Sequence, residues 1–318
     1  MKKYELTTNT KIRMGRKLFQ IKAVISFGNV KAGDLGGYIE KEENLSHDGD
    51  AWVYGDAQVF GNARVYGDAR VCGDAWVYGD AQVFGNALVF GNARVCGDAW
   101  VYGDAQVCGD ALVCGDARVY GDARVFGNAR VYGDAWVYGD ARVYGDARVC
   151  GDAWVYGDAQ VFGNARVFGN ARVYGDARVF GNARVYGDAW VYGDAWVYGD
   201  AQVFGNALVF GNARVCGDAW VYGDAQVCGD AWVCGDALVC GDADYICFKG
   251  LGSASRNTTM FRTQNGDVFV RCGCFGGSLK EFAEKVKETH GNSKYAKEYL
   301  ACVEVAKIHF EIGEENDR

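Results

Sequence analysis

The stretch GDAWVYGDAQVFGNARVYGDARVC, residues 49–72, begins a six-residue repeat that continues to residue 246. The 198 residues 49–246 contain 33 hexads with no insertion or deletion. One hexad is too short to bury an apolar face by itself, so it can do so only by stacking on further copies. The strict period therefore predicts a solenoid, and this decides the fold of most of the chain.

The pattern inside the hexad predicts one short strand and one corner. Ala51 and Val53 are separated by Trp52, and this alternation is typical of a strand that buries Ala and Val and exposes the residue between them. Gly followed by Asp or Asn opens each hexad, and both positions tolerate the backbone of a tight corner. Three such sides would close a triangular coil of 18 residues, giving about 11 coils in which residues i and i+18 stack.

The motif VYGDAR (65–70) resembles the hexapeptide repeat of left-handed parallel β-helices, the superfamily of bacterial acyltransferases and γ-class carbonic anhydrases. Within it the chain is most similar to the YdcK-like putative transferases, because the opening segments LFQIKAV (18–24) and VKAGDLGGYI (30–39) also resemble the start of those proteins. The resemblance implies an all-β solenoid with left-handed coils. One departure is that Tyr, Phe or Cys follows Val here, where the superfamily often has a small or acidic residue.

Shorter segments flank the repeat. We expect residues 1–48 to form an N-terminal cap that hides the open edge of the first coil. In this segment residues 17–27 alternate as one or two strands would, and Gly36-Gly37 should break the pattern before Tyr38.

Residues 247–318 predict a small α+β domain. Residues 258–263 and 267–274 flank Asn265-Gly266, a strong hairpin signal. Ser278 and Glu281 form a capping-box pattern that should open a helix ending near Gly291, and a second helix is expected over residues 293–310. We expect this domain to carry partner specificity.

Composition limits the functional classes. The formal net charge is −8, and the repeat holds 25 Asp against 13 Arg, so non-specific nucleic-acid binding is disfavoured. The 13 Cys do not form the disulfide framework of a small secreted domain, and no leader opens the chain, so we expect a cytoplasmic protein. No run approaches the length of a membrane span, and we expect no membrane partner.

The repeat lacks the residues of known catalytic sites in its superfamily. Acyltransferases there generally use a histidine base and γ-class carbonic anhydrases bind zinc through three histidines, but the repeat contains no His, Lys, Ser, Thr or Glu. We therefore expect a non-enzymatic structural or protein-binding scaffold. The alternatives are an acyltransferase-like enzyme with its site in the cap or tail, and an acidic inhibitor that mimics nucleic acid, for which a phage or prophage origin would be natural.

Stacking by 18 residues arranges the outward side chains in columns. Tyrosines share one column and tryptophans the column beside it, and these aromatic residues could form a self-association interface or stabilise the sheet through their own neighbours. The resemblance implies an oligomer, a trimer or a dimer, and a further protein partner is also expected. The interface candidates are Tyr102, Tyr120, Tyr138, Tyr156, Tyr174, Tyr192, Trp100, Trp136, Trp154 and Trp190.

Arginines form the candidate anion-binding residues. One outward column places four arginines in consecutive coils, beside corners that are mostly Asn, although neighbouring Asp corners could supply the counter-charge. Two further arginines lie in the segment GLGSASRNTTMFR (250–262), which could hold a phosphate or carboxylate. The candidates are Arg130, Arg148, Arg166, Arg184, Arg256 and Arg262.

Two metal sites are conceivable and neither is expected. Cys272 and Cys274 lie two apart on an expected strand, so both thiols would face one side, where Cys247, Cys302 or His290 could complete a zinc site. Stacked corner aspartates could hold Ca²⁺, but their usual role is a hydrogen bond to the backbone. We expect no metal ion and no other cofactor.

Overall fold

The computed structural model describes residues 1–312, which form a parallel β-solenoid of about 11 coils with an N-terminal cap and a small C-terminal α+β domain. The chain divides into two compact units, Met1–Gly175 and Asp176–Arg318. Unit 1 contains the cap and the coils from β4 (Trp52–Val53) to β24 (Arg172–Val173). Unit 2 contains the coils from β25 (Arg178–Val179) to β35 (Leu238–Val239) and the C-terminal domain.

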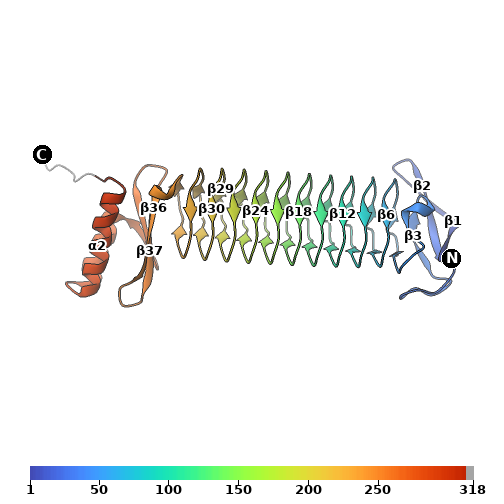
Figure 1. Ribbon diagram of the computed structural model, residues 1–318, viewed down its shortest axis with the longest axis horizontal. Coiled ribbons are helices and arrows are strands. Elements are labelled where there is room, and N and C mark those ends of the chain that lie inside the picture. The colour runs from blue at the N-terminus through green and yellow to red at the C-terminus, as the bar shows by residue number, and fades with distance from the viewer. Residues whose placement is uncertain (313–318) are drawn as a thin grey trace. The chain divides into compact units, whose positions relative to one another are not determined.

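Each side of a coil is a strand of two residues, the outward residue and the Val that follows it. In unit 1 every third strand belongs to the same parallel sheet, and Figure 1 labels β6 (Arg64–Val65), β12 (Trp100–Val101), β18 (Trp136–Val137) and β24 of one such sheet. The Ala and Val of the repeat, from Ala51 to Val239, are fully buried and make up the solenoid core. The sequence prediction of coils of three sides, with residues i and i+18 stacked, is confirmed.

The corner glycines are required for two reasons. Gly97 has φ +67°, and a Cβ built there would lie 2.9 Å from the backbone nitrogen of Gly115 in the next coil. Any other residue would therefore be strained and would also push the coils apart.

Hydrogen bonds between coils give the solenoid a direction. The backbone N–H of Arg130 donates to the carbonyl of Ala147 at 2.9 Å, and the other coils repeat this pattern toward the C-terminus. A solenoid built this way leaves carbonyl groups unpaired at its first coil and N–H groups unpaired at its last. The cap must therefore supply donors, and the C-terminal domain must supply acceptors.

The cap in unit 1 supplies those donors. The ammonium group of Lys3, which is 1% exposed, donates to the carbonyls of Gly49 and Ala51 at 3.1 and 2.8 Å. Asn44 donates through its side-chain amide to Gly61 and Ala63, at 3.1 and 2.8 Å. Desolvation lowers the pKa of Lys3 to about 8. The prediction of an N-terminal cap on the solenoid is confirmed.

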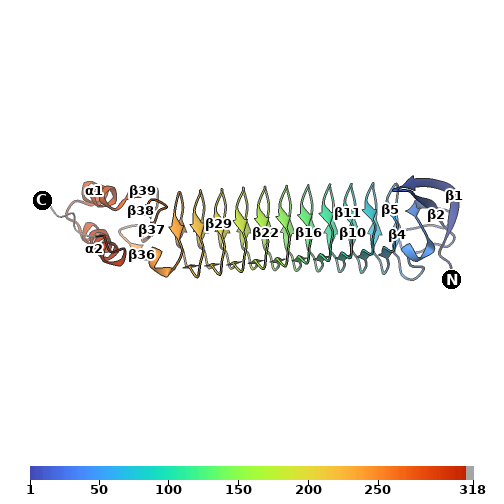
Figure 2. The ribbon, with the colours of Figure 1, turned by 90° about the horizontal axis from the view of Figure 1, so that it is seen from above.

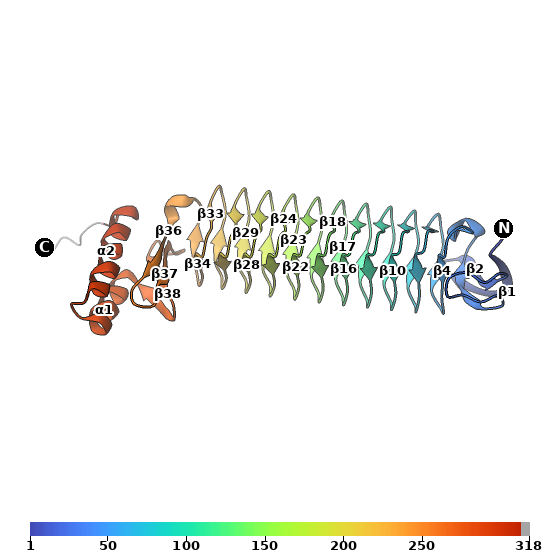
Figure 3. The same ribbon diagram turned by 60° about the horizontal axis from the view of Figure 1, so that its bottom comes forward.

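The strands of the cap differ in part from the sequence prediction. They are β1 (Tyr4–Arg13), β2 (Arg16–Ala23) and β3 (Leu35–Ile39), followed by the short helix η1 (Glu42–Asn44), and Figure 3 shows β1 and β2 near β4. The sequence did not predict β1, and Gly36-Gly37 lies within β3 instead of interrupting a strand. The reason is close packing, because a Cβ on Gly36 would lie 2.7 Å from the Trp52 ring and one on Gly37 would lie 2.5 Å from the Ala57 carbonyl oxygen.

The C-terminal domain in unit 2 supplies the acceptors. The hydroxyl of Thr259 accepts from the backbone N–H of Trp232 at 2.9 Å, and the carboxylate of Asp242 accepts from that of Gln226 at 2.9 Å. The final hexad, residues 241–246, forms the helix η2 (Asp242–Asp244) and the start of β36 (Tyr245–Leu251) instead of a solenoid side. Asp244 stands at the outward position there and accepts from the N–H of Cys240 at 2.9 Å, which ends the coil.

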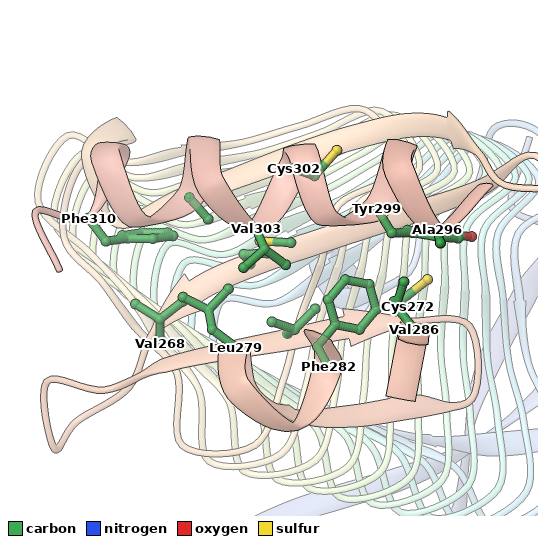
Figure 4. Packing of buried hydrophobic residues seen from close by; sticks show 13 residues of the cluster. Val268, Cys272, Leu279, Phe282, Val286, Ala296, Tyr299, Cys302, Val303 and Phe310 are labelled. Carbon is green, nitrogen blue, oxygen red and sulfur yellow. The ribbon is translucent and has the colours of Figure 1, made fainter. Parts of the chain in front are cut away.

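The expected hairpin and both expected helices are present. β36, β37 (Arg256–Arg262), β38 (Val268–Cys272) and β39 (Phe275–Ser278) form an antiparallel sheet, and Figure 2 shows α1 (Leu279–His290) and α2 (Lys294–His309) lying beside it. The predicted capping box is formed, because Ser278 accepts from Glu281 N–H at 3.2 Å and Glu281 accepts from Ser278 N–H at 2.8 Å. The sheet and helices enclose a second core that includes Phe282, Tyr299 and Val303 (Figure 4).

Candidate interaction surfaces

Aromatic rings stack along one sheet of unit 1. The Tyr102 and Tyr120 ring centroids are 4.8 Å apart with planes 4° apart, and Tyr120 and Tyr138 follow at 4.9 Å and 2°. The coil spacing sets this distance, so one ring per coil forms a continuous column. Burial raises the pKa of Tyr138 to about 12, which keeps its phenol neutral. The column comprises Tyr66, Phe84, Tyr102, Tyr120, Tyr138, Tyr156 and Tyr174.

A second column on the same sheet contains both indole and guanidinium groups. The Arg118 guanidinium carbon lies 5.2 Å from the Trp100 ring centroid and 4.9 Å from that of Trp136. Trp136 and Trp154 stack at 5.1 Å, and Arg172 lies 4.8 Å from Trp154. We call these five residues, together with the tyrosine column, the aromatic face of unit 1. The predicted stacking of its residues is confirmed, whereas their role in an interface stays a prediction.

Unit 2 carries the remaining candidates of these columns. Tyr192 stacks on Phe210 at 5.0 Å, and Trp190 is paired in register with Leu208. Arg184 is paired in register with Gln202, so its neighbour in unit 2 is uncharged.

The predicted arginine ladder is present in unit 1. Arg130, Arg148 and Arg166 occupy paired positions of the neighbouring strands β17 (Arg130–Val131), β20 (Arg148–Val149) and β23 (Arg166–Val167). Arg130 and Arg166 are exposed and Arg148 is half-buried. Among residues 1–312 the ion-paired arginines are Arg16 and Arg262, so these three guanidinium groups have no carboxylate partner.

The two C-terminal arginine candidates lie in different surroundings. Arg262 holds the domain together, since it donates to the Phe310 carbonyl at 2.8 Å and lies 3.5 Å from the Asp244 carboxylate. Its donors are therefore partly used inside unit 2. Arg256 instead lines a pocket of about 330 Å³ with Arg214 and Arg271, two residues that the sequence analysis did not single out.

The expected geometry of the Cys272 and Cys274 pair is wrong. Cys272 ends β38 and is buried, whereas Cys274 is exposed, because Gly273 with φ +57° turns the chain between them. The two thiols thus do not face one side of a strand. Within residues 1–312, no group of three or more His, Cys, Asp or Glu side chains is arranged to hold a metal ion.

His47 and His290 stack on tyrosine rings. The Nδ1 atom of His47 accepts from the Lys3 backbone N–H at 3.3 Å, and its ring stacks on Tyr4 at 4.3 Å. His290 stacks on Tyr299 at 5.7 Å. In the described part of the chain no histidine forms a hydrogen bond with a Ser, Thr or Cys side chain.

Two pairs of thiols stack in consecutive coils, a feature that the sequence analysis did not use. Cys96 follows β11 (Arg94–Val95) and Cys114 follows β14 (Leu112–Val113), whose residues pair in register. The hydrogen bond from Cys114 lowers the pKa of Cys96 to about 6, while the same bond raises the pKa of Cys114. Cys216 and Cys234 repeat the arrangement in unit 2. The signal was visible as two cysteines 18 residues apart.

Comparison with known proteins agrees with this architecture. The family model named YdcK Beta solenoid repeat matches eleven segments that together span just over half of the chain, at residues 57–73, 81–97, 93–109, 105–121, 123–139, 141–157, 159–175, 171–185, 183–199, 201–217 and 213–229. The chain belongs to the YdcK β-solenoid repeat family. The matched segments of this YdcK-type solenoid include the whole aromatic face and the arginine ladder.

The YdcK family assignment supplies a fold and no activity. No curated protein sequence matches the chain. A search of the described helices finds none with the length and apolar character needed to cross a membrane.

Proposed function

We propose that this YdcK-type solenoid is a non-enzymatic protein-binding scaffold that associates with further copies of itself through the aromatic face of unit 1. The observation that carries the proposal is the continuous column of stacked rings beside Trp100, Trp136 and Trp154 on one sheet. Left-handed coils and a cytoplasmic location, which the sequence suggests, are part of the proposal.

The composition of this face favours an interface. Ring stacking covers the flat faces of the tyrosines along the column, but the side chains stay only half-buried and Trp100 is 36% exposed. Trp, Tyr and Arg are the residue types enriched at the energetic centres of protein interfaces. Covering this face would remove apolar area from water at about 25 cal/mol per Å².

Sedimentation velocity of the full chain at tens of micromolar tests the proposal. We expect a dimer or trimer, and we expect W136K/W154K to sediment as a monomer because two ammonium groups would be buried in the contact. Trp76→Lys is the control, since Trp76 lies in β8 (Trp76–Val77) of a different sheet. A monomeric wild-type protein would contradict the proposal, as would equal effects of the two sets of substitutions.

A nucleic-acid mimic is the second candidate. Five consecutive coils of unit 1 place an aspartate at the same corner, namely Asp80, Asp98, Asp116, Asp134 and Asp152. Such a row of carboxylates carries negative charges at a regular interval, as a phosphate backbone does. Competition with duplex DNA for a DNA-binding protein would support this candidate, and an acetyl-CoA titration would address the acyltransferase alternative.

A further inference from the structure

Three arginines from separate parts of the sequence meet in unit 2. Arg214 belongs to β31 (Arg214–Val215), Arg256 opens β37 and Arg271 lies in β38, and together they line the pocket of about 330 Å³. Trp232 of β34 (Trp232–Val233) forms part of the wall. The pocket is thus built where the C-terminal sheet covers the last coils.

The tryptophan holds two of these guanidinium groups in place. The Arg271 guanidinium carbon lies 4.1 Å from the centroid of the Trp232 ring, and that of Arg214 lies 5.8 Å from the same ring and 5.2 Å from the Trp196 ring. Stacking of this kind fixes the plane of the guanidinium and lowers the entropy lost when it binds a ligand. The Arg271 Nε atom is buried and has no hydrogen-bond partner among residues 1–312, so Arg271 has unused donor capacity.

The charges of the pocket are not balanced. Its one acidic lining residue, Asp230, accepts from the Asn212 side-chain amide at 2.9 Å and pairs with the Lys249 ammonium at 3.0 Å. These two partners lower the pKa of Asp230 and satisfy its charge. None of the three arginines forms an ion pair within the described residues. The pocket is therefore strongly cationic in a chain whose net charge is −8.

We propose that this pocket is a binding site for a small phosphate-bearing anion. Guanidinium groups present parallel N–H donors that match phosphate oxygens, and three of them can surround a tetrahedral group from different directions. A monocarboxylate offers one charge and two oxygens, so it would leave part of this donor set unused. The volume suits a compact ligand such as pyrophosphate or a phosphate ester, and unscreened repulsion between the arginines would be relieved when it binds.

Calorimetric titration of the full chain with pyrophosphate, in a phosphate-free buffer of low ionic strength, tests the site. We expect one saturable binding event per chain that weakens as salt is added. R256Q/R271Q should bind at least tenfold more weakly. R124Q/R142Q is the charge-matched control, because this pair lies in unit 1 on β16 (Arg124–Val125) and β19 (Arg142–Val143) and should bind as the wild type does.

Acetate binding and the melting temperature give two further tests of the site. Acetate at the same concentration should neither bind nor compete, and pyrophosphate should raise the melting temperature of the wild-type protein but not of R256Q/R271Q. If loss of the Arg271 stack on Trp232 prevents R256Q/R271Q from folding, the single variant Arg256→Gln tests the site instead. Arg256 is exposed, so its replacement should leave the fold intact. No saturable pyrophosphate binding by the wild type, or equal binding by folded R256Q/R271Q, would overturn the proposal. Neither outcome depends on self-association through the aromatic face.

Discussion

The side-chain amide of Asn128 donates a hydrogen bond of 3.1 Å to the carboxylate of Asp146 in the next coil. Two aspartates at this spacing would have no proton to share and would repel each other, so each Asn replaces a repulsion with a bond. The arrangement recurs at other corners where Asn precedes Asp by one coil. Further pairs are Asn62 and Asp80, Asn86 and Asp104, Asn92 and Asp110, Asn182 and Asp200, Asn206 and Asp224, and Asn212 and Asp230.

Asn128→Asp should therefore destabilise the protein. The pair is exposed, so we expect a loss of about 0.5–1 kcal/mol at low ionic strength, and a smaller loss in concentrated salt, which screens the new repulsion. Asp146→Asn is the control, because two amides can still share a hydrogen bond at no electrostatic cost. Chemical denaturation at low and high salt measures both variants, and equal stability of N128D and the wild type at low salt would refute the explanation.

The arginine ladder should bind long polyanions that span several coils. The strands that carry these arginines are about 4.8 Å apart, so their guanidinium groups repel one another, and a bound polyanion would relieve that repulsion. R148Q/R166Q should show weaker and less salt-sensitive binding of a polyphosphate, with almost unchanged stability. Titration calorimetry and thermal denaturation measure the two effects. Unchanged binding together with a markedly lower melting temperature would show instead that the ladder stabilises the solenoid.

Deletion of a whole coil should be tolerated better than deletion of one side. Removing residues 133–150 keeps every later column in register, so Tyr120 would stack on Tyr156 and the aromatic face would persist. Removing residues 133–138 should also leave a folded Ala and Val core, but it would carry Tyr156 and Tyr174 to a neighbouring side. We expect self-association to survive the first deletion and to weaken in the second, as measured by sedimentation. Equal association of the two proteins would contradict the role of the face.

Cys96 should be the reactive thiol of its column. Its pKa is lowered to about 6 by the hydrogen bond from Cys114, whereas burial raises the pKa of Cys108. The thiolate is the nucleophile, so alkylation of Cys96 by iodoacetamide should switch on as the pH rises through about 6. At neutral pH Cys96 should react faster than Cys108, and mass spectrometry of the peptides measures the ratio.

The partner thiol gives the control for this reactivity. Cys114→Ala removes the donor, so the pKa of Cys96 should rise and the onset of alkylation should move to higher pH. The pair loses its protons in two linked steps, the first easily and the second with difficulty. An unchanged alkylation profile in C114A would mean that Cys114 does not control the reactivity.

The repeat could be predicted from sequence because each of its residues stacks on the residue 18 positions further along the chain. Once three hexads close a coil, Tyr120 must meet Tyr138 and Arg130 must meet Arg148, and the structure places them so. Short-range signals were also sufficient for the C-terminal hairpin and for the helix capped by Ser278. Each of these features depends on residues that are close in sequence or separated by a fixed period.

Features at the two ends of the solenoid depended on tertiary structure instead. Lys3 has no sequence pattern that marks it as a buried donor, and it becomes one only because the first coil leaves carbonyl groups unpaired. Gly36-Gly37 looked like a strand break because the close approach of Trp52 and Ala57 cannot be seen in the sequence.

The repeat alone determined the coil, its core and its columns, because a period of six residues leaves no other way to bury Ala and Val. Tertiary structure decided that Arg214, Arg256 and Arg271 share one pocket. These residues lie on three different strands, and no repeat period relates their positions in the sequence. Their meeting depends on how the C-terminal sheet accepts the unpaired N–H groups of the last coil, as Thr259 does for Trp232. Contacts of that kind follow from the packing of whole elements, which neither spacing nor composition encodes.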